Sequence, residues 1–174
     1  YGVPQMRERI YFIGIRKDLV KENKCFEWPI PIKLPEIKDY LIDDNELEFN
    51  EKKQAYETFL RFLNNRYNKD NFKIKELLKE EYLVLDTRQS DLRLYHGKVP
   101  TLRTGRHGIL YVRNGKFRKL SGFESLLLQG FPKSLAGKVK GKIADVYLLS
   151  QAGNAMTINT IEAVGNSLLK YIKE

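Results

Sequence analysis

Apolar residues in the first half of the chain form one short run and one helical stripe. Residues 9–15 are dense in β-branched and aromatic side chains and are too few for a buried helix, so this run predicts an interior strand. Three prolines between residues 29 and 35 predict a connector. Beyond it, charged residues flank a stripe at helical spacing that consists of Tyr56, Phe59, Leu60, Leu63 and Tyr67. We expect a helix there and a second helix over residues 72–82.

The second half of the chain changes to short strands and a capped helix. Residues 109–113 and 116–120 flank Asn114-Gly115, the kind of dipeptide that most favours a two-residue hairpin turn. Ser121 and Glu124 have the spacing of a capping box, in which the serine oxygen and the glutamate each satisfy a free backbone N–H. These signals predict a hairpin followed by a helix over residues 123–129 that ends near Gly130.

The last predicted helix begins at about Thr157. Its apolar face consists of Ile158, Ile161, Val164, Leu168 and Ile172, while Asn159, Glu162, Asn166 and Lys170 lie away from that face. Such a helix must dock on something apolar. Together with the short strands, it predicts a mixed α/β (α+β) fold.

Composition argues against several classes of protein. The sequence has no run of eighteen apolar residues and no charged-then-apolar leader, so we expect an intracellular, cytoplasmic protein with no membrane partner. Cys25 is the single cysteine, and with only His96 and His107 beside it we expect neither a disulfide nor a metal site. The chain begins with Tyr1 rather than methionine, which we interpret as the start of a fragment.

Charge is unevenly distributed along the chain. The formal net charge is +9 and the isoelectric point is about 9.5, which favours polyanionic partners. Residues 88–119 contain nine Lys and Arg against one acid, Asp91, whereas residues 36–81 contain twelve acids and nine bases. A basic run is as often a solvated face as a nucleic-acid surface. Glycine, threonine and histidine are interleaved with the bases here, so we favour a binding surface.

Three separated stretches carry motifs. Residues 1–10 contain Gln5, Arg7 and Arg9 in a Gln-x-Arg-x-Arg pattern, residues 118–132 end in Leu-Gln-Gly-Phe-Pro, and residues 151–154 are Gln-Ala-Gly-Asn. In content, order and spacing they resemble the carboxyl-terminal motifs of the cytosine-5 DNA methyltransferase family, and the resemblance covers essentially the whole chain. Phe123 stands where that family usually has arginine, and Ala155 stands where a serine is frequent.

The resemblance implies a transferase that uses S-adenosylmethionine and a cytosine flipped out of the duplex. In the family, a cysteine of a Pro-Cys motif adds to carbon 6 of the cytosine, and the methyl group is transferred to carbon 5. Cys25 follows the first motif instead of preceding it, so we expect a packed thiol and not the nucleophile. The family's glycine-rich donor loop and Glu-Asn-Val motif are also not found. We therefore expect this chain alone to be inactive. Its expected partner is a missing catalytic half, which would also bind most of the S-adenosylmethionine.

The first motif is expected to lie beside the active site. The resemblance implies that Gln5, Arg7 and Arg9 contact phosphates around the flipped nucleotide and that Arg9 supports the target base region, since guanidinium groups offer fixed donors to anionic oxygens. The alternative for Arg7 is a bracing role, through a salt bridge to a neighbour such as Glu8. Asn154 is expected beside the methyl donor, although a turn asparagine satisfying its own backbone would look the same in sequence.

The family's variable region ends near a Thr-Leu pair, which Thr101 and Leu102 match, and this pair locates the expected DNA-reading loop. Residues 103–108 are Arg-Thr-Gly-Arg-His-Gly, in which glycine allows close approach and arginine can grip guanine O6 and N7. We expect Arg103 or Arg106 to read a base. The other expected DNA contacts, Arg88, Arg93 and Lys98, would go to phosphate. The alternative is that all five cationic side chains contact only the DNA backbone.

The resemblance also divides the chain. Residues 1–19 would carry a strand and the DNA-contact motif of an otherwise absent doubly wound catalytic domain, residues 20–140 the target-recognition domain, and residues 141–174 the helical return. A strand and a helix that cover an absent sheet would expose apolar surface, so we expect self-association or a partner chain. The leading function is recognition of double-stranded DNA for a restriction–modification methyltransferase. Two rivals are a non-catalytic DNA-binding module of a restriction or regulatory complex and a relative acting on tRNA.

Overall fold

The fold is built on a four-stranded antiparallel sheet. The computed structural model describes residues 1–21, 25–43, 54–63, 72–88 and 92–172. Strand order in the sheet is β3 (Arg93–Tyr95), β2 (Val84–Asp86), β5 (Ile109–Arg113) and β6 (Lys116–Lys119). A separate parallel pair joins β1 (Gln5–Met6) to β4 (Val99–Pro100). Two small sheets combined with helices confirm the mixed α/β class.

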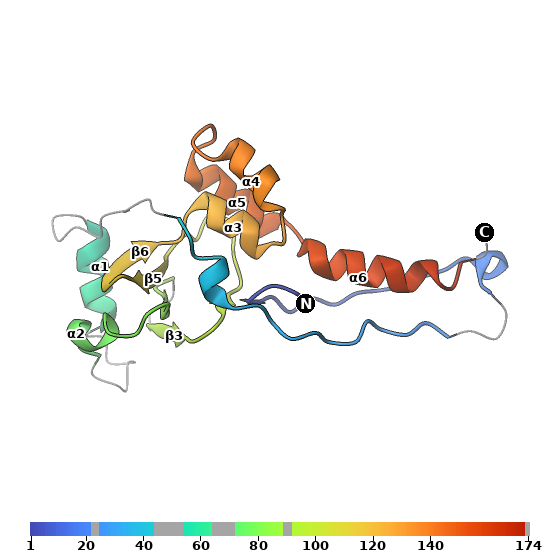
Figure 1. Cartoon of the computed structure of the whole chain (residues 1–174), viewed down its shortest axis with the longest axis horizontal. Helices are drawn as coiled ribbons and strands as arrows, with labels where there is room; N and C mark the ends of the chain where they lie inside the picture. Colours follow the sequence, from blue (N-terminus) through green and yellow to red (C-terminus); the bar gives the residue numbers. More distant parts are fainter. Residues whose placement is uncertain (22–24, 44–53, 64–71, 89–91, 173–174) are drawn as a thin grey trace.

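Side chains on the two faces of the sheet belong to two separate cores, because successive residues of a strand point to opposite faces. On one face, Val84 and Tyr111 join buried residues of α3 (Gly122–Leu128) and α5 (Asp145–Asn154). On the other face, Leu85 and Leu110 join buried residues of α1 (Gln54–Leu63) and α2 (Ile74–Leu77). Figure 1 shows the sheet between these two groups of helices. Burial on both faces explains why β5 is apolar without interruption from Ile109 to Val112.

The predicted hairpin and capped helix are both confirmed. Asn114 and Gly115 adopt positive φ angles of 54° and 65°, as a type I′ turn requires, and join β5 to β6. Ser121 Oγ accepts a hydrogen bond from Glu124 N at 3.2 Å, and Glu124 Oε2 accepts one from Ser121 N at 3.0 Å. After α3, Gly130 takes a φ of 85°, so the backbone can turn sharply into the next segment.

The predicted helices of the first half are shorter than their apolar stripes. Helix α1 ends at Leu63; Tyr67 lies outside the described residues, as does the side chain of Tyr56. Helix α2 covers Ile74–Leu77 instead of residues 72–82. The sheet captures the end of that segment, because Tyr82 N donates to Val112 O at 2.8 Å with Tyr82 at a positive φ of 59°. Hydrogen bonding to the sheet therefore overrides the local helical pattern.

Two helices lie where the sequence pattern predicted none, α4 (Lys133–Val139) and α5. Each buries little of itself: within α5 only Leu148 and Ala152 are buried, and within α4 only Ala136. Such a narrow apolar contact produces a weak periodic signal in the sequence. Helix α5 packs against α3 and presents its last turn to the segment between β4 and β5.

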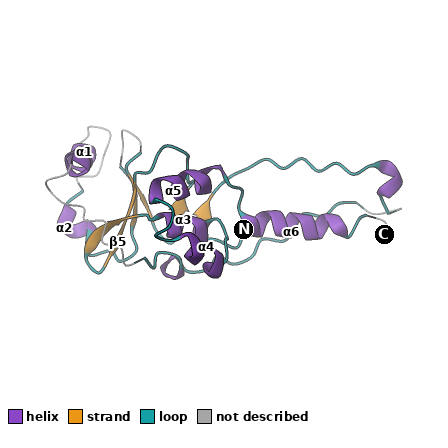
Figure 2. Cartoon of the chain, turned by 90° about the horizontal axis from the view of Figure 1, so that it is seen from above, coloured by secondary structure: helices purple, strands orange, loops and turns teal. Residues whose placement is uncertain are grey.

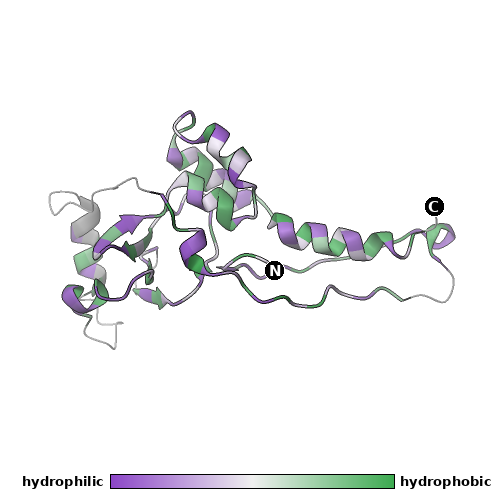
Figure 3. Ribbon diagram, viewed as in Figure 1, coloured by the Kyte–Doolittle hydropathy of each residue, from purple (hydrophilic) through white to green (hydrophobic). Residues whose placement is uncertain are grey.

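The last predicted helix is α6 (Ile158–Leu169), which projects away from the sheet together with extended chain at residues 9–16 and 25–36 and the 3-10 helix η1 (Lys17–Leu19) (Figures 1 and 2). The projecting unit is closed at its far end, where Val20 pairs with Ile172 and Lys21 N donates to Tyr171 O at 2.9 Å. Hydrophobic and hydrophilic residues alternate along this unit (Figure 3), and no residue of α6 itself is buried. We refer to residues 9–36 and α6 as the arm.

Two expectations for the arm are not met among the described residues. Residues 9–15 form no strand, and Ile10 and Phe12 are 82% and 92% exposed, because an extended segment becomes a strand only beside a hydrogen-bonding neighbour and the described residues offer none. Cys25 is an exposed thiol and not a packed one, because the extended chain around it has no core to enter. In the described part of the chain, no helix has the length and apolar character needed to cross a bilayer.

Candidate nucleic-acid interface

The first motif is attached to the second through Gln5. Gln5 Nε2 donates to Leu128 O at 2.8 Å, and Gln5 is only 8% exposed. Strand pairing places Gln5 opposite Val99 and Met6 opposite Pro100, and Thr101 Oγ1 donates to Met6 O. Gln5 therefore lies inside the protein, where its amide joins the motif to α3 instead of pointing to solvent.

The second and third motifs are attached to each other through Gln129, which is fully buried. Its Nε2 donates to Ala152 O at 2.5 Å, and its Oε1 accepts from Thr157 Oγ1 at 3.1 Å. Its backbone carbonyl accepts from Ile158 N at 2.9 Å. One glutamine thus holds the end of α3, the last turn of α5 and the start of α6 together.

Arg7 braces the same region from the N-terminal side. Its Nη1 donates to Leu102 O and its Nη2 to Gly153 O, each at 3.1 Å. Burial lowers the pKa of this guanidinium, and the neighbouring Arg9 lowers it further. The bracing alternative for Arg7 therefore agrees with this geometry, with backbone carbonyls as partners in place of Glu8.

Residues 101–108, which we call the arginine loop, pass over the last turn of α5. Thr104 Oγ1 donates to Asn154 Oδ1 at 2.6 Å and approaches Ser150 O at 3.3 Å. Gly153 permits this contact, since a Cβ there would lie 2.5 Å from Thr104 N. At the tip, Arg103 and Arg106 form an isolated antiparallel bridge around Gly105, whose φ is +70°. Both arginines are exposed.

Arg88 was expected to contact a DNA phosphate, but its side chain is buried within the protein. Its guanidinium forms a two-point ion pair with Asp86, Nε to Oδ1 and Nη2 to Oδ2 at 2.7 Å each, and its Nη1 donates to Thr101 O at 2.7 Å. Only 4% of the Arg88 side chain is exposed. A phosphate contact does not fit this arrangement, because the guanidinium is occupied within the protein.

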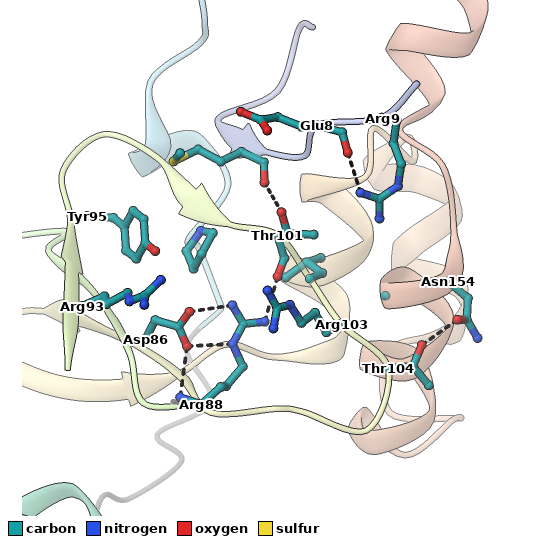
Figure 4. Close-up of a pocket in the computed structure, with 14 residues that line it drawn as sticks. Glu8, Arg9, Asp86, Arg88, Arg93, Tyr95, Thr101, Arg103, Thr104 and Asn154 are labelled. Carbon is teal, nitrogen blue, oxygen red and sulfur yellow. Dashed lines mark hydrogen bonds and ion pairs between the residues drawn. The ribbon is translucent and has the colours of Figure 1, made fainter. Parts of the chain in front are cut away.

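A basic cleft of about 740 Å³ lies where the first motif, β3, the arginine loop and the end of α5 meet (Figure 4). Its cationic lining residues are Arg9, Arg88, Arg93 and Arg103, against the acids Glu8 and Asp86. Arg9, Arg93 and Arg103 are exposed, and Arg9 Nη1 donates to Glu8 O at 2.6 Å. With Asp86 and Arg88 neutralising each other, the accessible charge of the cleft is positive.

The predicted site residues are thus partly brought together. The cleft is lined by Arg9, Arg88, Arg93, Thr101, Leu102, Arg103 and Asn154, whereas Gln5, Arg7, Lys98 and Arg106 are not among its lining residues. Leu102 is a core residue at 3% exposure, so its contribution to the cleft is mainly its backbone. Arg106 lies beside His107, whose Nε2 is 3.4 Å from Ser150 Oγ, on a second small pocket of the arginine loop.

Sequence reasoning did not single out several residues that line the cleft, among them Asp86, Tyr95 and Gly153. The Asp-x-Arg spacing of residues 86–88 was an available signal for the first, because side chains two apart on an extended segment share a face. Gly153 was visible inside the third motif, but its close approach to the arginine loop depends on how α5 packs. Tyr95, between Leu94 and His96, offered no signal in the sequence.

A buried carboxyl group joins the sheet to α3. Glu124 Oε1 accepts from Tyr111 Oη at 2.8 Å and from Asp43 N at 2.9 Å, in addition to its role in the capping box. Burial raises the pKa of Glu124 to about 7 and also raises the pKa of Tyr111. Among the described residues, no group of three His, Cys, Asp or Glu side chains could hold a metal ion.

Comparison with known proteins agrees with this combination of motifs. Residues 1–170 match the family model described as C-5 cytosine-specific DNA methylase. The Type II methyltransferase M.HhaI of Haemophilus parahaemolyticus is 31% identical over 173 residues, covering 97% of this chain and 50% of that protein. The Type II methyltransferase M.Bsp6I of Bacillus sp. (strain RFL6) is 26% identical over 175 residues, covering 97% of this chain and 51% of that protein.

A third relative, the Type II methyltransferase M1.ScrFI of Lactococcus lactis subsp. cremoris, is 24% identical over 179 residues, covering all of this chain and 42% of that protein. The chain therefore spans about half the length of the curated relatives it matches. Because the family model covers nearly the whole chain, the chain belongs to the C-5 cytosine-specific DNA methylase family.

Proposed function

We propose that this chain is the carboxyl-terminal, DNA-recognising part of a cytosine-5 DNA methyltransferase and that duplex DNA lies along the basic cleft. The observation that carries the proposal is the group of exposed arginines, Arg9, Arg93 and Arg103, on a cleft built where the first and third motifs meet the arginine loop. Guanidinium groups on a concave surface suit phosphate oxygens and guanine edges alike.

The arginines of the cleft and of the arginine loop would contact different parts of the DNA. Arg9 lies on the first motif and would contact the DNA near the target cytosine. Arg93 and Arg103 approach the cleft from β3 and from the arginine loop. Arg106 is exposed at the tip of that loop, where it would meet DNA beyond the cleft. Either Arg103 or Arg106 reads a base, and the remaining arginines contact phosphates.

The family implies S-adenosylmethionine as the methyl donor. Asn154 fits only an edge of such a site: it is exposed, it lines the cleft, and its Oδ1 already accepts from Thr104, which leaves its NH₂ group as the donor to a ligand. The chemistry supplied by the bound donor is a methyl group for carbon 5 of cytosine. Most of the donor site and the nucleophilic cysteine would belong to the catalytic half, so this chain alone is inactive.

The arm would be the surface that the catalytic half covers. Its exposed apolar residues, at 46% exposure or more, are Ile10, Phe12, Trp28, Ile30, Ile32, Leu34 and Leu169. Exposed apolar residues in such number are typical of a surface that a partner buries. Cys25 lies on the same arm, on a different segment from the cleft, and serves no catalytic role in this proposal.

The test is selection of duplex DNA from a random-sequence library at two salt concentrations, followed by sequencing of the retained DNA. A short enriched motif that contains cytosine and survives the higher salt supports recognition by this chain. Retained DNA without a motif that disappears with salt would reduce the chain to a nonspecific basic surface. Arg106→Ala then separates the two roles of that residue: relaxed discrimination at one base pair means base reading, and equal weakening on all sequences means phosphate contact.

Addition of a catalytic half from a relative tests the enzymatic part of the proposal. Methyl transfer by the pair, and none by either half, is the expected result. An inactive pair that still binds DNA specifically would favour the alternative, a non-catalytic DNA-binding module. Competition of duplex DNA against tRNA excludes or supports a relative that acts on RNA.

A further inference from the structure

Three consecutive residues at the end of β2 hold both ends of the arginine loop. At its start, Arg88 Nη1 donates to Thr101 O at 2.7 Å. At its end, Gly108 O accepts from both the backbone N–H and the hydroxyl of Thr87, at 2.8 Å each. The loop is therefore anchored at both ends to one short segment of the sheet, and Asp86 completes that segment.

Asp86 fixes the direction of the Arg88 side chain. The carboxylate accepts from Nε and Nη2, on one edge of the guanidinium, at 2.7 Å each and also accepts from Arg88 N at 3.1 Å. The two side chains are only 3% and 4% exposed. Because a guanidinium is planar and rigid, two-point attachment to Asp86 leaves Nη1 with one available direction, which is toward Thr101 O. A lysine at this position could not satisfy the carboxylate and the carbonyl with the same geometry.

The end of the arginine loop at Gly108 also packs closely against the segment of residues 86–88. A Cβ on Gly108 would lie 2.6 Å from Thr87 Oγ1 and 3.1 Å from Arg88 Cγ. The backbone of the loop is therefore in direct contact with the segment that anchors it. Between the two anchors, the exposed side chains are those of residues 103–106, including both candidate base-reading arginines.

We propose that Asp86 and Arg88 are positioning residues for DNA sequence discrimination, which act by holding the arginine loop and do not touch DNA. This inference rests on the proposed function. Base reading requires donor positions correct to a fraction of an ångström, whereas a phosphate attracts a cation over a broad range of positions. Loss of the pair should therefore cost discrimination and leave nonspecific affinity nearly unchanged.

The test compares the double variant D86N/R88M with R16M. The double variant removes both charges, so no buried charge is left without its partner. R16M breaks a pair with the same spacing and the same two-point geometry, Arg16 to Asp18 at 2.6 and 2.8 Å, but with side chains 74% and 62% exposed. Dissociation constants are measured for the duplex that the wild-type chain enriches and for random duplex, over a series of salt concentrations.

For D86N/R88M, we expect affinity for the enriched duplex to fall roughly 5- to 100-fold, the range of one base contact. Affinity for random duplex and the slope of log K against log salt stay at wild-type values, and R16M changes nothing. Equal weakening on both duplexes, with a slope smaller by about one, would show that Arg88 contacts phosphate and would overturn the inference. Unchanged discrimination would overturn it as well.

Amide hydrogen exchange supplies a readout that needs no DNA. The double variant should exchange faster in residues 101–108 while β5 and α3 remain protected, and R16M should match wild type. Uniformly faster exchange would indicate general loss of structure; R88K, which keeps the charge and lacks the fork, is then the deciding variant. Wild-type-like discrimination by R88K refutes positioning by the fork. If the wild-type chain enriches no motif, the proposed function fails, and unchanged exchange in the loop of D86N/R88M would separately reject the anchoring role.

Discussion

Thr104 Oγ1 donates a 2.6 Å hydrogen bond to Asn154 Oδ1, which ties the arginine loop to the last residue of α5. The two residues are fifty positions apart, and both are exposed. The bond joins the loop proposed to read DNA to the asparagine proposed to meet the methyl donor. We therefore expect substitutions of Thr104 and Asn154 to be energetically coupled.

A double-mutant cycle measures this coupling. T104V and N154A should each lower the free energy of unfolding by about 0.5–1.5 kcal/mol, and the double variant should lose less than their sum because the bond can be lost only once. Chemical denaturation provides the values. T160V is the matched control, since Thr160 makes no side-chain hydrogen bond among the described residues. Strictly additive effects would show that the bond contributes nothing.

Two glycines inside helices should respond oppositely to alanine. In Gly153→Ala the added methyl group would lie 2.5 Å from Thr104 N and 2.6 Å from the backbone carbon of Arg103, so the loop or the helix must move. We expect a loss of about 1–3 kcal/mol in stability and weaker DNA binding. Gly137→Ala in α4 meets nothing within 4 Å and should be neutral or stabilising by up to about 1 kcal/mol. Thermal unfolding of both variants decides the matter, and equal effects would contradict the close contact.

Substitution of the two arginines of the first motif should affect different properties, the stability of the fold for Arg7 and DNA binding for Arg9. R7A removes both donors that bind the carbonyls of Leu102 and Gly153, and we expect it to cost about 1–3 kcal/mol in unfolding free energy. R9A removes an exposed side chain and should change stability by less than about 0.5 kcal/mol while weakening DNA binding. Denaturation and DNA titration of the same preparations test the pair. A stable R7A variant would refute the bracing role.

Glu124 should make stability depend on pH. Its pKa is raised from an ordinary 4.5 to about 7 in the folded chain, chiefly by burial, so between these values the folded state holds a proton that the unfolded state releases. The contribution of Glu124 to the free energy of unfolding is therefore largest below about pH 4.5, decreases as the pH rises, and is lost above about pH 7. The total change is on the order of 3 kcal/mol.

Denaturation of the wild-type chain and E124Q at several pH values between 4.5 and 8 checks this expectation. E124Q cannot titrate, so its stability should vary less over that range. Its amide oxygen can keep the capping box, but its NH₂ group cannot accept from Asp43 N and Tyr111 Oη, which lowers its stability throughout. An identical pH slope in the two proteins would assign the dependence to other groups.

Local signals predicted the central part of the fold. The turn at Asn114-Gly115 and the capping box at Ser121 and Glu124 depend on hydrogen bonds between residues at most four apart, so the residue types alone carry the information. The first and third motifs and the basic run also predicted where the candidate cleft would draw its residues. Their packing into one site followed from the family pattern and not from any local rule.

Roles of individual arginines depended on what lies near them in space. Arg88 and Arg103 belong to the same basic run, yet one is buried against Asp86 and the other is exposed on the cleft. Arg7 resembles Arg9 in sequence, but it alone reaches the carbonyls of Leu102 and Gly153. A guanidinium has the same donors everywhere, so only the position of its acceptors separates a brace from a binding group.

The sequence by itself determined the family, the mixed α/β class, the hairpin, the capped helix and the concentration of positive charge. Only the tertiary structure decided that residues 9–15 stay extended without a strand partner, that Cys25 is exposed, and that Asp86 and Arg88 anchor the arginine loop. The physical reason is the range of the interactions: turns and caps close over a few residues, whereas strand pairing, burial and ion-pair geometry depend on segments that meet only when the chain is folded.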